Sequence, residues 1–404
     1  MILFAPNPTG SGHNMRALSI ARAIRQIQPE AQLKVALASL QPVFTPLFEA
    51  SGIDVVDIAG QLVDYSKKSN LSKNLDWAGY IGGYVANSFL SGERILSYLA
   101  LIDQYKPKVL VSDFNMAACL AAIFSRTPLV FVTERYDFTL CQLSDDDLRE
   151  GGFDVNTDDL ARARAALHMQ FGWMIEHSRL ILTDKPYIPE MDDGTPVAAA
   201  LAEGRAHFTG PMIRDMQHSN GAKVRADLGL GDSPFIVASI SGTTMFAENK
   251  DALLQGYLEG YELLRQQFPT LKMVLLGRQV MADRDGVICV PYYPDWMGLL
   301  RETRLLLSAP GWITVTEVAA MRIPTFFILP SKSEYHEAEA LDRLDRLGFP
   351  TYLGCDSIMI AELVARELQR DTAADSYFKA HERVCAPDGN GAARAAQMIV
   401  DLIC

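Results

Sequence analysis

One stretch, residues 308–348, limits the possible fold of this chain more than any other. Its sequence is SAPGWITVTEVAAMRIPTFFILPSKSEYHEAEALDRLDRLG. The apolar run just before it, residues 304–308, is typical of a buried parallel strand, and a turn at 309–311 ends that strand. We predict a helix over 314–321 and a second strand over 325–329. These elements form a βαβ unit, whose helix N-terminus can bind a phosphate group.

Thr314 and Glu317 within this unit allow two interpretations. They are three residues apart, so on a helix both side chains lie on one face of the first turn. A hydroxyl near the helix N-terminus and a carboxylate one turn further on suit the diphosphate and the ribose hydroxyls of a nucleotide. The same two residues also fit a T-x-x-E capping box, in which Glu317 only accepts a backbone hydrogen bond. Their spacing leaves both interpretations open.

A second glycine-containing turn follows a predicted buried strand at the start of the chain, residues 1–5. Residues 7–13, NPTGSGH, lead into a helix predicted from Asn14 to about Gln26. A turn of this kind between strand and helix indicates ligand binding at the carboxyl edge of a parallel sheet. Met15 stands where a dinucleotide fingerprint needs its third glycine, so an NAD enzyme is not expected.

His13 and Asp113 are the candidate catalytic residues. His13 follows the G-x-G turn directly, where an imidazole can accept the proton of an attacking hydroxyl or donate to a leaving diphosphate. Asp113 ends the predicted strand 108–112 and can act as the base itself or orient His13. Each has a structural alternative, namely a hydrogen-bonded core histidine and a helix cap. We place His13 first and Asp113 second.

Composition narrows the class of protein. A chain of 404 residues is long enough for two domains. Its net charge of −12 argues against a nucleic-acid partner, because phosphate backbones are bound by clustered Lys and Arg. The six cysteines are scattered without a C-x-x-C pair, and neither a signal peptide nor a membrane helix is evident, which favours a cytoplasmic protein.

Residues 308–330 resemble the C-terminal donor-binding signature of GT-B glycosyltransferases, families 28 and 1, and most closely family 28. The family 28 pattern is S-G-x-x-T-x-x-E-x-x-x-x-G-x-P, and four residues of this chain fall on it: Gly311, Thr314, Glu317 and Pro324. The segment GSGHNMRALSIARAI resembles the N-terminal G-x-G-H-x-x-R motif of the same family. HFTGPMIR, residues 207–214, resembles the T-G-x-P-x-R segment that closes its first domain.

The chain departs from the family in its D/E-Q-x-x-N-A pattern, whose Gln and acid contact the donor sugar. The corresponding segment is YHEAEA, in which His336 replaces Gln and Glu339 replaces Asn. This difference leaves the identity of the sugar, and of the nucleotide, open.

The resemblance implies a GT-B fold, in which two Rossmann-like parallel-sheet α/β domains face each other across a cleft. The expected parts are an acceptor-side domain at 1–214, a linker at 215–222, a donor-binding domain at 223–390 and a helix at 391–404 that crosses back to the first domain. The implied reaction is metal-independent, inverting transfer of a sugar from a nucleoside diphosphate, with UDP or dTDP expected, to an acceptor hydroxyl.

The resemblance also assigns candidate site residues. The predicted donor-binding residues are Gly10, Gly12, Ser241, Gly242, Thr243, Arg278, Tyr293, Gly311, Thr314, Glu317 and His336. The predicted acceptor residues are Asn14, Arg16 and Glu134. No cofactor is expected, since the nucleotide sugar is a co-substrate. The acceptor is a small molecule or a glycan precursor, and only a few lysines near residue 70 favour contact with a membrane.

Two alternatives remain beside the transferase. The same fold supports hydrolysis or epimerisation of a nucleotide sugar, in which water or the enzyme itself replaces the acceptor. A non-catalytic partner subunit is the third possibility, and the altered YHEAEA segment is the feature that favours it.

Overall fold

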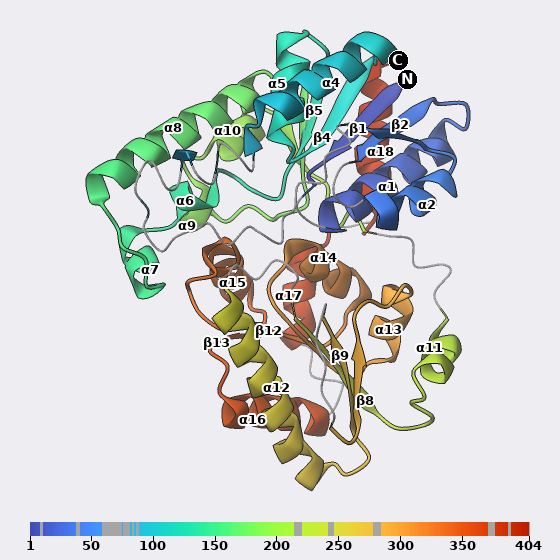
Figure 1. Ribbon diagram of the computed structural model, residues 1–404, viewed down its shortest axis with the longest axis vertical. Coiled ribbons are helices and arrows are strands. Elements are labelled where there is room, and N and C mark those ends of the chain that lie inside the picture. Colours follow the sequence, from blue (N-terminus) through green and yellow to red (C-terminus); the bar gives the residue numbers. More distant parts are fainter. Residues whose placement is uncertain are drawn as a thin grey trace. The chain divides into compact units, whose positions relative to one another are not determined.

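The chain forms two compact units, shown in the computed structural model of Figure 1. The structure describes residues 1–8, 11–37, 41–58, 75, 81–82, 85, 89–213, 220–240, 246–277, 284–370, 376–386 and 389–403. Unit 1 comprises Met1–Arg214 together with Val384–Cys404, and unit 2 comprises Asp215–Arg383. The chain thus rejoins unit 1 at Val384, before the predicted boundary at 391.

Unit 1 is built on a parallel sheet whose described part has seven strands in the order β3-β2-β1-β4-β5-β6-β7. The strands are β1 (Ile2–Pro6), β2 (Leu33–Leu37), β3 (Asp54–Asp57), β4 (Val109–Asp113), β5 (Leu129–Val132), β6 (Leu180–Thr183) and β7 (Ala206–Phe208). The strand order reverses between β1 and β4, which pair directly from Ile2 opposite Val109 to Pro6 opposite Asp113. Ligands of open α/β sheets bind at such a reversal, beyond the carboxyl ends of the strands.

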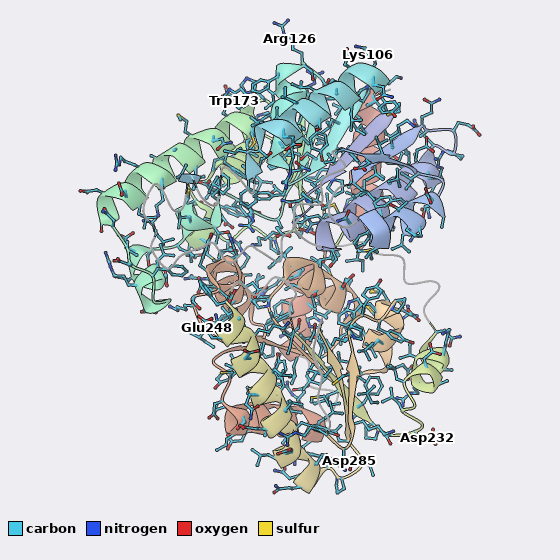
Figure 2. The ribbon with its side chains drawn as sticks, viewed as in Figure 1. Lys106, Arg126, Trp173, Asp232, Glu248 and Asp285 are labelled. Carbon is cyan, nitrogen blue, oxygen red and sulfur yellow. The ribbon has the colours of Figure 1, made fainter. Side chains whose placement is uncertain are left out.

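Helices cover the unit 1 sheet. They are α1 (Ser11–Ile27), α2 (Gln41–Glu49), α4 (Gly92–Tyr105), α5 (Met116–Phe124), α6 (Thr139–Gln142), α7 (Asp145–Glu150), α8 (Thr157–Glu176), α9 (Pro189–Asp192), α10 (Pro196–Ala202) and α18 (Gly391–Ile403). Several of these helices have an N-cap residue whose side chain accepts a hydrogen bond from a backbone N–H of the first turn, namely Asn115, Ser144, Asn156 and Thr195. Lys106 and Arg126 follow α4 and α5 in left-handed turns, at the surface of unit 1 (Figure 2).

The C-terminal helix α18 belongs to the core of unit 1. Its buried side chains recur at helical spacing, so one face is apolar: Ala392, Ala395, Ala396, Ile399 and Val400. This face joins the same core as α1 and the first strands, and Figure 1 shows α18, in red, beside α1.

Two glycines, Gly210 and Gly391, allow close backbone packing where the C-terminal part of the chain rejoins unit 1. Gly210 adopts φ +72°, and a Cβ there would lie 2.7 Å from the backbone nitrogen of Ala386. A Cβ on Gly391 would lie 2.3 Å from the carbonyl oxygen of Gly210 and 2.5 Å from that of Pro211. The T-G-P segment after β7 therefore packs closely against Ala386 and Gly391.

Unit 2 contains a second parallel sheet, whose described part has six strands in the order β10-β9-β8-β11-β12-β13. Its strands are β8 (Phe235–Ser239), β9 (Lys272–Leu276), β10 (Val287–Val290), β11 (Leu306–Ser308), β12 (Thr325–Leu329) and β13 (Thr351–Leu353). Its helices are α11 (Gly221–Asp227), α12 (Ala247–Gln267), α13 (Trp296–Glu302), α14 (Trp312–Met321), α15 (Tyr335–Leu347), α16 (Ser357–Gln369) and α17 (Ser376–Val384). The predicted architecture of two parallel-sheet α/β domains is confirmed.

No described helix combines the length and the apolar composition that a membrane span requires.

His381, on α17, makes the stability of unit 2 depend on pH. The ring is 1% exposed, stacks on Phe349 at a centroid distance of 5.1 Å and meets Phe378 edge-on. Burial, aided by the charge of Arg322, lowers the pKa of His381 from 6.5 to about 4. The unfolded chain therefore binds this proton more tightly than the native state, and stability is lost as the pH falls below 6.5.

We expect this histidine to remove about 2 kcal/mol of stability at about pH 5 relative to neutral pH. In His381→Phe the difference in melting temperature between the two conditions should shrink, since no proton binds there. The exposed His177→Gln serves as the control, because its side chain lies at the surface and outside the unit 2 core. An unchanged pH dependence in His381→Phe would show that acid destabilises the protein elsewhere.

Candidate functional site

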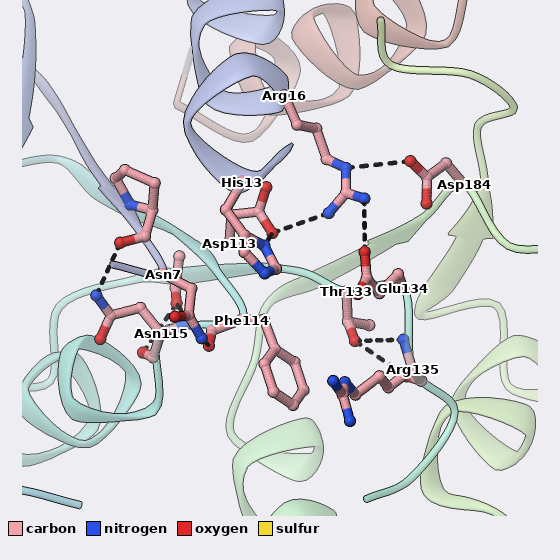
Figure 3. Close-up of polar contacts among 12 residues, drawn as sticks. Asn7, His13, Arg16, Asp113, Phe114, Asn115, Thr133, Glu134, Arg135 and Asp184 are labelled. Atoms are coloured by element: carbon pink, nitrogen blue, oxygen red, sulfur yellow. Dashed lines mark hydrogen bonds and ion pairs between the residues drawn. The ribbon is translucent and has the colours of Figure 1, made fainter. Parts of the chain in front are cut away.

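His13 lies in the first turn of α1, directly beyond the carboxyl end of β1. The helix begins at Ser11 rather than at the predicted Asn14, so Gly12 and His13 are helical. The His13 side chain is 14% exposed, and its Nδ1 lies 2.8 Å from Oδ1 of Asp113. Asp113 is the last residue of β4, the strand beside β1. The reversal of strand order thus brings the two predicted catalytic residues together, as Figure 3 shows.

This pair has the geometry of a base and its orienting carboxylate. When Nδ1 carries a proton and donates it to Asp113, Nε2 keeps its lone pair and can accept a proton. The carboxylate also stabilises the imidazolium that forms when Nε2 accepts it. Asp113 is only 2% exposed, so water does not compete with His13 for its carboxylate.

The backbone around Asp113 is held in a strained turn. Phe114 has φ +48°, a conformation that costs energy for a bulky residue. The carbonyl of Phe114 accepts a hydrogen bond from the side-chain Nδ2 of Asn7 at 2.7 Å. The backbone N–H of Asn7 donates to the carbonyl of Asp113 at 2.9 Å. Asn115 donates to the carbonyl of Pro6 at 3.0 Å and caps α5. These bonds join the ends of β1 and β4 and fix the position of Asp113.

Arg16 lies one turn after His13 and is fully buried. Its guanidinium donates in three directions: Nη1 to Asp113 Oδ1 at 2.9 Å, Nη2 to Glu134 Oε2 at 3.0 Å, and Nε to Asp184 Oδ2 at 3.1 Å (Figure 3). A side chain buried in this way is suited to holding carboxylates together, not to the predicted contact with an acceptor. Glu134, also predicted to contact the acceptor, is 22% exposed and can still reach solvent. Asn14 is buried at 2% exposure.

The surroundings of this cluster shift the pKa values of two of its acids in opposite directions. Burial alone would raise the pKa of Glu134, but neighbouring basic groups outweigh it and hold the pKa at about 2. These groups, in order of strength, are Arg16, His13, Arg135 and Lys185. Burial raises the pKa of Asp184 to about 6 against the opposing charge of Arg16, and the carboxylates of Glu134 and Asp113 add to the rise. Asp184 therefore gains a proton at a pH only slightly below neutral.

Asp184 was not among the residues predicted from the sequence. It follows β6 directly, just as Asp113 ends β4, so the same signal of an acid at the carboxyl end of a buried strand marks it.

In unit 2, the turn after β11 leads into α14, which begins earlier than predicted. Gly311 is the N-cap residue and makes no side-chain cap, so Thr314 and Glu317 lie inside the helix and do not form a capping box there. The capping-box interpretation of that pair is therefore wrong. Among the described residues, a Cβ on Gly311 would meet nothing within 4 Å, and its φ is −62°. Packing does not require this glycine, whereas close approach of a ligand to the helix N-terminus does favour it.

Glu317 has a structural partner. Its side chain is buried at 1% exposure, and its Oε2 accepts a hydrogen bond from Trp296 Nε1 at 2.7 Å. Trp296 is the first residue of α13, and sequence reasoning did not identify it. Thr314 is half-buried one turn earlier on α14. A substitution of Glu317 must therefore keep an acceptor for the indole N–H if it is to test ligand binding.

The segment that departs from the family pattern is explained in part by an internal ion pair. Glu339 is 5% exposed, and its Oε1 accepts from Arg343 Nε at 2.9 Å and Nη2 at 2.8 Å. Arg343 is fully buried one turn further along α15, so the Glu in place of Asn is matched within the same helix. His336, in the first turn of α15, is half-buried, and the centroid of its ring lies 4.0 Å from that of the Tyr335 ring.

Glu334, just before α15, holds the start of α12. It is 1% exposed and accepts from the Phe246 amide at 3.0 Å and from Asn249 Nδ2 at 2.8 Å. A carboxylate at a helix N-terminus is stabilised by the unpaired amides there.

Other predicted donor residues lie elsewhere. Tyr293 follows β10 and is 9% exposed, with its hydroxyl 3.1 Å from Asp227 Oδ2 on α11. Five predicted residues lie outside the described part of the chain: Gly10, Ser241, Gly242, Thr243 and Arg278.

The sequence matches no protein-family model and no curated protein. Solved structures of low sequence identity nevertheless share its fold along the whole chain. Os79 from O. sativa, in complex with U2F and trichothecene, has 14% identity and a TM-score of 0.68, covering 100% of both chains. The calicheamicin glycosyltransferase CalG4 has 15% identity and a TM-score of 0.65, covering 99% of this chain and 98% of its own.

The fold is shared with a second class of protein as well. A putative UDP-N-acetylglucosamine 2-epimerase from Listeria monocytogenes has 13% identity and a TM-score of 0.60, covering 99% of this chain and 94% of its own. Two parallel sheets of Rossmann type, matched over their full length by these structures, show that the chain has the GT-B fold.

Proposed function

We propose that this protein is a nucleotide-sugar-dependent glycosyltransferase in which His13 is the general base. One observation carries the proposal, namely the 2.8 Å contact between His13 Nδ1 and Asp113 Oδ1 at the strand-order reversal of a GT-B sheet. The acceptor hydroxyl gives its proton to Nε2 of His13 as its oxygen attacks the anomeric carbon of the sugar. The bond from that carbon to the diphosphate breaks, and the nucleoside diphosphate leaves with the bonding electrons. Attack from the side opposite the leaving group inverts the anomeric configuration.

Unit 2 is the proposed donor-binding unit. Gly311 and the N-terminus of α14 suit the diphosphate, since backbone amides and the helix dipole stabilise negative charge as it develops. Thr314 and Glu317 follow on the same helix and are the proposed contacts to the nucleoside of that donor. UDP is the first donor to test, because the structures with this fold include complexes with UDP, and dTDP is the second. Os79 in complex with trichothecene favours a small-molecule acceptor over a polymer.

The proposal is tested by incubating the protein with UDP-glucose, UDP-N-acetylglucosamine and dTDP-glucose, each with a panel of phenolic and sugar-alcohol acceptors. Mass spectrometry detects the glycosylated product, and proton NMR of that product reports the anomeric configuration. We expect a β-linked product from an α-linked donor. Retention of configuration would contradict direct displacement with His13 as base.

Hydrolysis or epimerisation of a nucleotide sugar is the second candidate, favoured by the epimerase that shares the fold over nearly the whole chain. The same donors, incubated without any acceptor, separate the two candidates. Free sugar or a new epimer would support the second candidate. Transfer is supported if the donor stays intact without acceptor and is consumed when an acceptor is added.

A further inference from the structure

The buried Arg16 lies beside the proposed base without being exposed to a substrate. Its three hydrogen bonds reach three carboxylates from different parts of the fold, one at the end of β4, one after β5 and one after β6. The planar guanidinium offers donors in fixed directions, so it can hold all three only in one arrangement. A lysine ammonium, a single point of charge, cannot replace it geometrically.

Asp113 depends on this guanidinium for its orientation. Its Oδ1 accepts from both Arg16 and His13, at 2.9 and 2.8 Å. Its Oδ2 is buried and makes no hydrogen bond to the described residues. The carboxylate is therefore positioned through Oδ1, and Arg16 is the charged group that fixes that oxygen in front of the imidazole.

Asp184 fixes Arg16 in turn. It is fully buried, and its Oδ2 accepts from Nε, the donor nearest the aliphatic part of the arginine side chain. The charged groups facing this cluster are His13 and Arg16 on α1, Asp113 at the end of β4, Glu134 and Arg135 after β5, and Asp184 and Lys185 after β6. Three acids thus surround one central arginine, and without it their mutual repulsion would displace Asp113.

We propose that Arg16, anchored by Asp184, is a positioning residue that holds Asp113 in register with His13, an inference that rests on the proposed function. Arg16 touches neither substrate, and its contribution reaches the reaction only through the His13–Asp113 pair.

Kinetics of single and double variants test this. Arg16→Lys should lower kcat by about 100-fold with KM for the donor changed less than about threefold, because the base is misplaced while the donor site is intact. In a His13→Ala background the same substitution should change the residual rate by less than about twofold, since its effect passes through His13. Arg22→Lys on the same helix, where Arg22 donates to Ser51 at 2.8 Å, is the matched control and should be near wild type. Equal losses in both backgrounds would overturn the proposal.

A second measurement needs no substrate, so it separates failure of this inference from failure of the proposed function. Nitrogen-15 NMR of histidine-labelled protein reports the tautomer of each of the seven histidines, and His13→Gln identifies the signal of His13. In wild type we expect the neutral ring to carry its proton on Nδ1. Arg16→Lys should shift population toward the Nε2–H tautomer. An unchanged tautomer in Arg16→Lys overturns the proposal whether or not wild type transfers a sugar.

Asp184→Asn keeps the test decisive if Arg16 variants do not fold. The amide oxygen still accepts from Nε, but the charge on the anchor is lost, so kcat should fall by about tenfold while folding is retained. The pKa of Asp184, about 6, adds a signature. Wild type should lose activity as Asp184 gains a proton near that pH, and this step should be absent from the pH profile of Asp184→Asn. Wild-type kcat and an unchanged profile in Asp184→Asn would count against the proposal.

Discussion

His13→Ala should lower kcat for sugar transfer by about 10²- to 10⁴-fold, because the acceptor hydroxyl loses the group that takes its proton. Asp113→Asn should cost less, since the base remains while its orienting charge is gone. Both variants should still bind the nucleoside diphosphate with wild-type affinity, because neither residue lies in unit 2. Steady-state kinetics with the donor found active, together with calorimetric titration of the diphosphate, measure the two quantities separately.

The surface variant His177→Ala is the control for His13→Ala, because His177 is exposed at the C-terminal end of α8, where its ring contacts the carbonyl of Trp173. A His13→Ala enzyme that retains activity within about threefold of wild type would show that the proton goes elsewhere.

Gly256→Ala should produce a large loss of stability, by a mechanism unrelated to the active site. Gly256 lies on α12, which packs against α16, and a Cβ there would lie 2.2 Å from the carbonyl oxygen of Cys355. The nearest atom belongs to the backbone, so the helices must move apart. We expect a net cost of about 2 kcal/mol, since overpacking costs about 1–3 kcal/mol or more and the gain in helix propensity recovers about 1. Differential scanning calorimetry checks this as a lower melting temperature of unit 2.

Gly172→Ala is the matched control for that substitution. Gly172 also lies within a long helix, α8, but its Cβ would meet only Pro196 Cγ at 3.7 Å, an ordinary contact. This variant should be more stable than wild type by about 0.5–1 kcal/mol. If Gly256→Ala behaves like Gly172→Ala, the close packing of α12 on α16 is not a feature of the folded protein.

The sequence allowed the two parallel sheets to be predicted, because buried parallel strands are continuous apolar runs between turns. The strand predicted at 325–329 agrees with β12, and the acid that ends β4 marked Asp113 as a neighbour of His13. These features depend on local sequence and on the pairing rules of parallel sheets.

Features that depend on tertiary packing could not be predicted. The edge strands β7 and β13 have three residues each, which is too short to show any periodicity. Arg16 was predicted to contact the acceptor, and only the fold surrounds it with three carboxylates. The capping box that Thr314 and Glu317 could have formed is absent because α14 begins at Trp312, and Trp296, a partner distant in sequence, donates to Glu317 instead.

The measurement that tests the account most directly is the melting temperature of the protein with UDP, dTDP, GDP or ADP, for wild type and Glu317→Gln. Glutamine keeps an acceptor for the Trp296 indole, so the variant should melt near wild type without ligand. We predict that UDP or dTDP, at about 100 times its dissociation constant, stabilises wild type by about 2.7 kcal/mol and that Glu317→Gln loses most of this shift. If none of the four diphosphates raises the melting temperature of the wild-type protein, the assignment of unit 2 as a nucleotide-sugar site is contradicted.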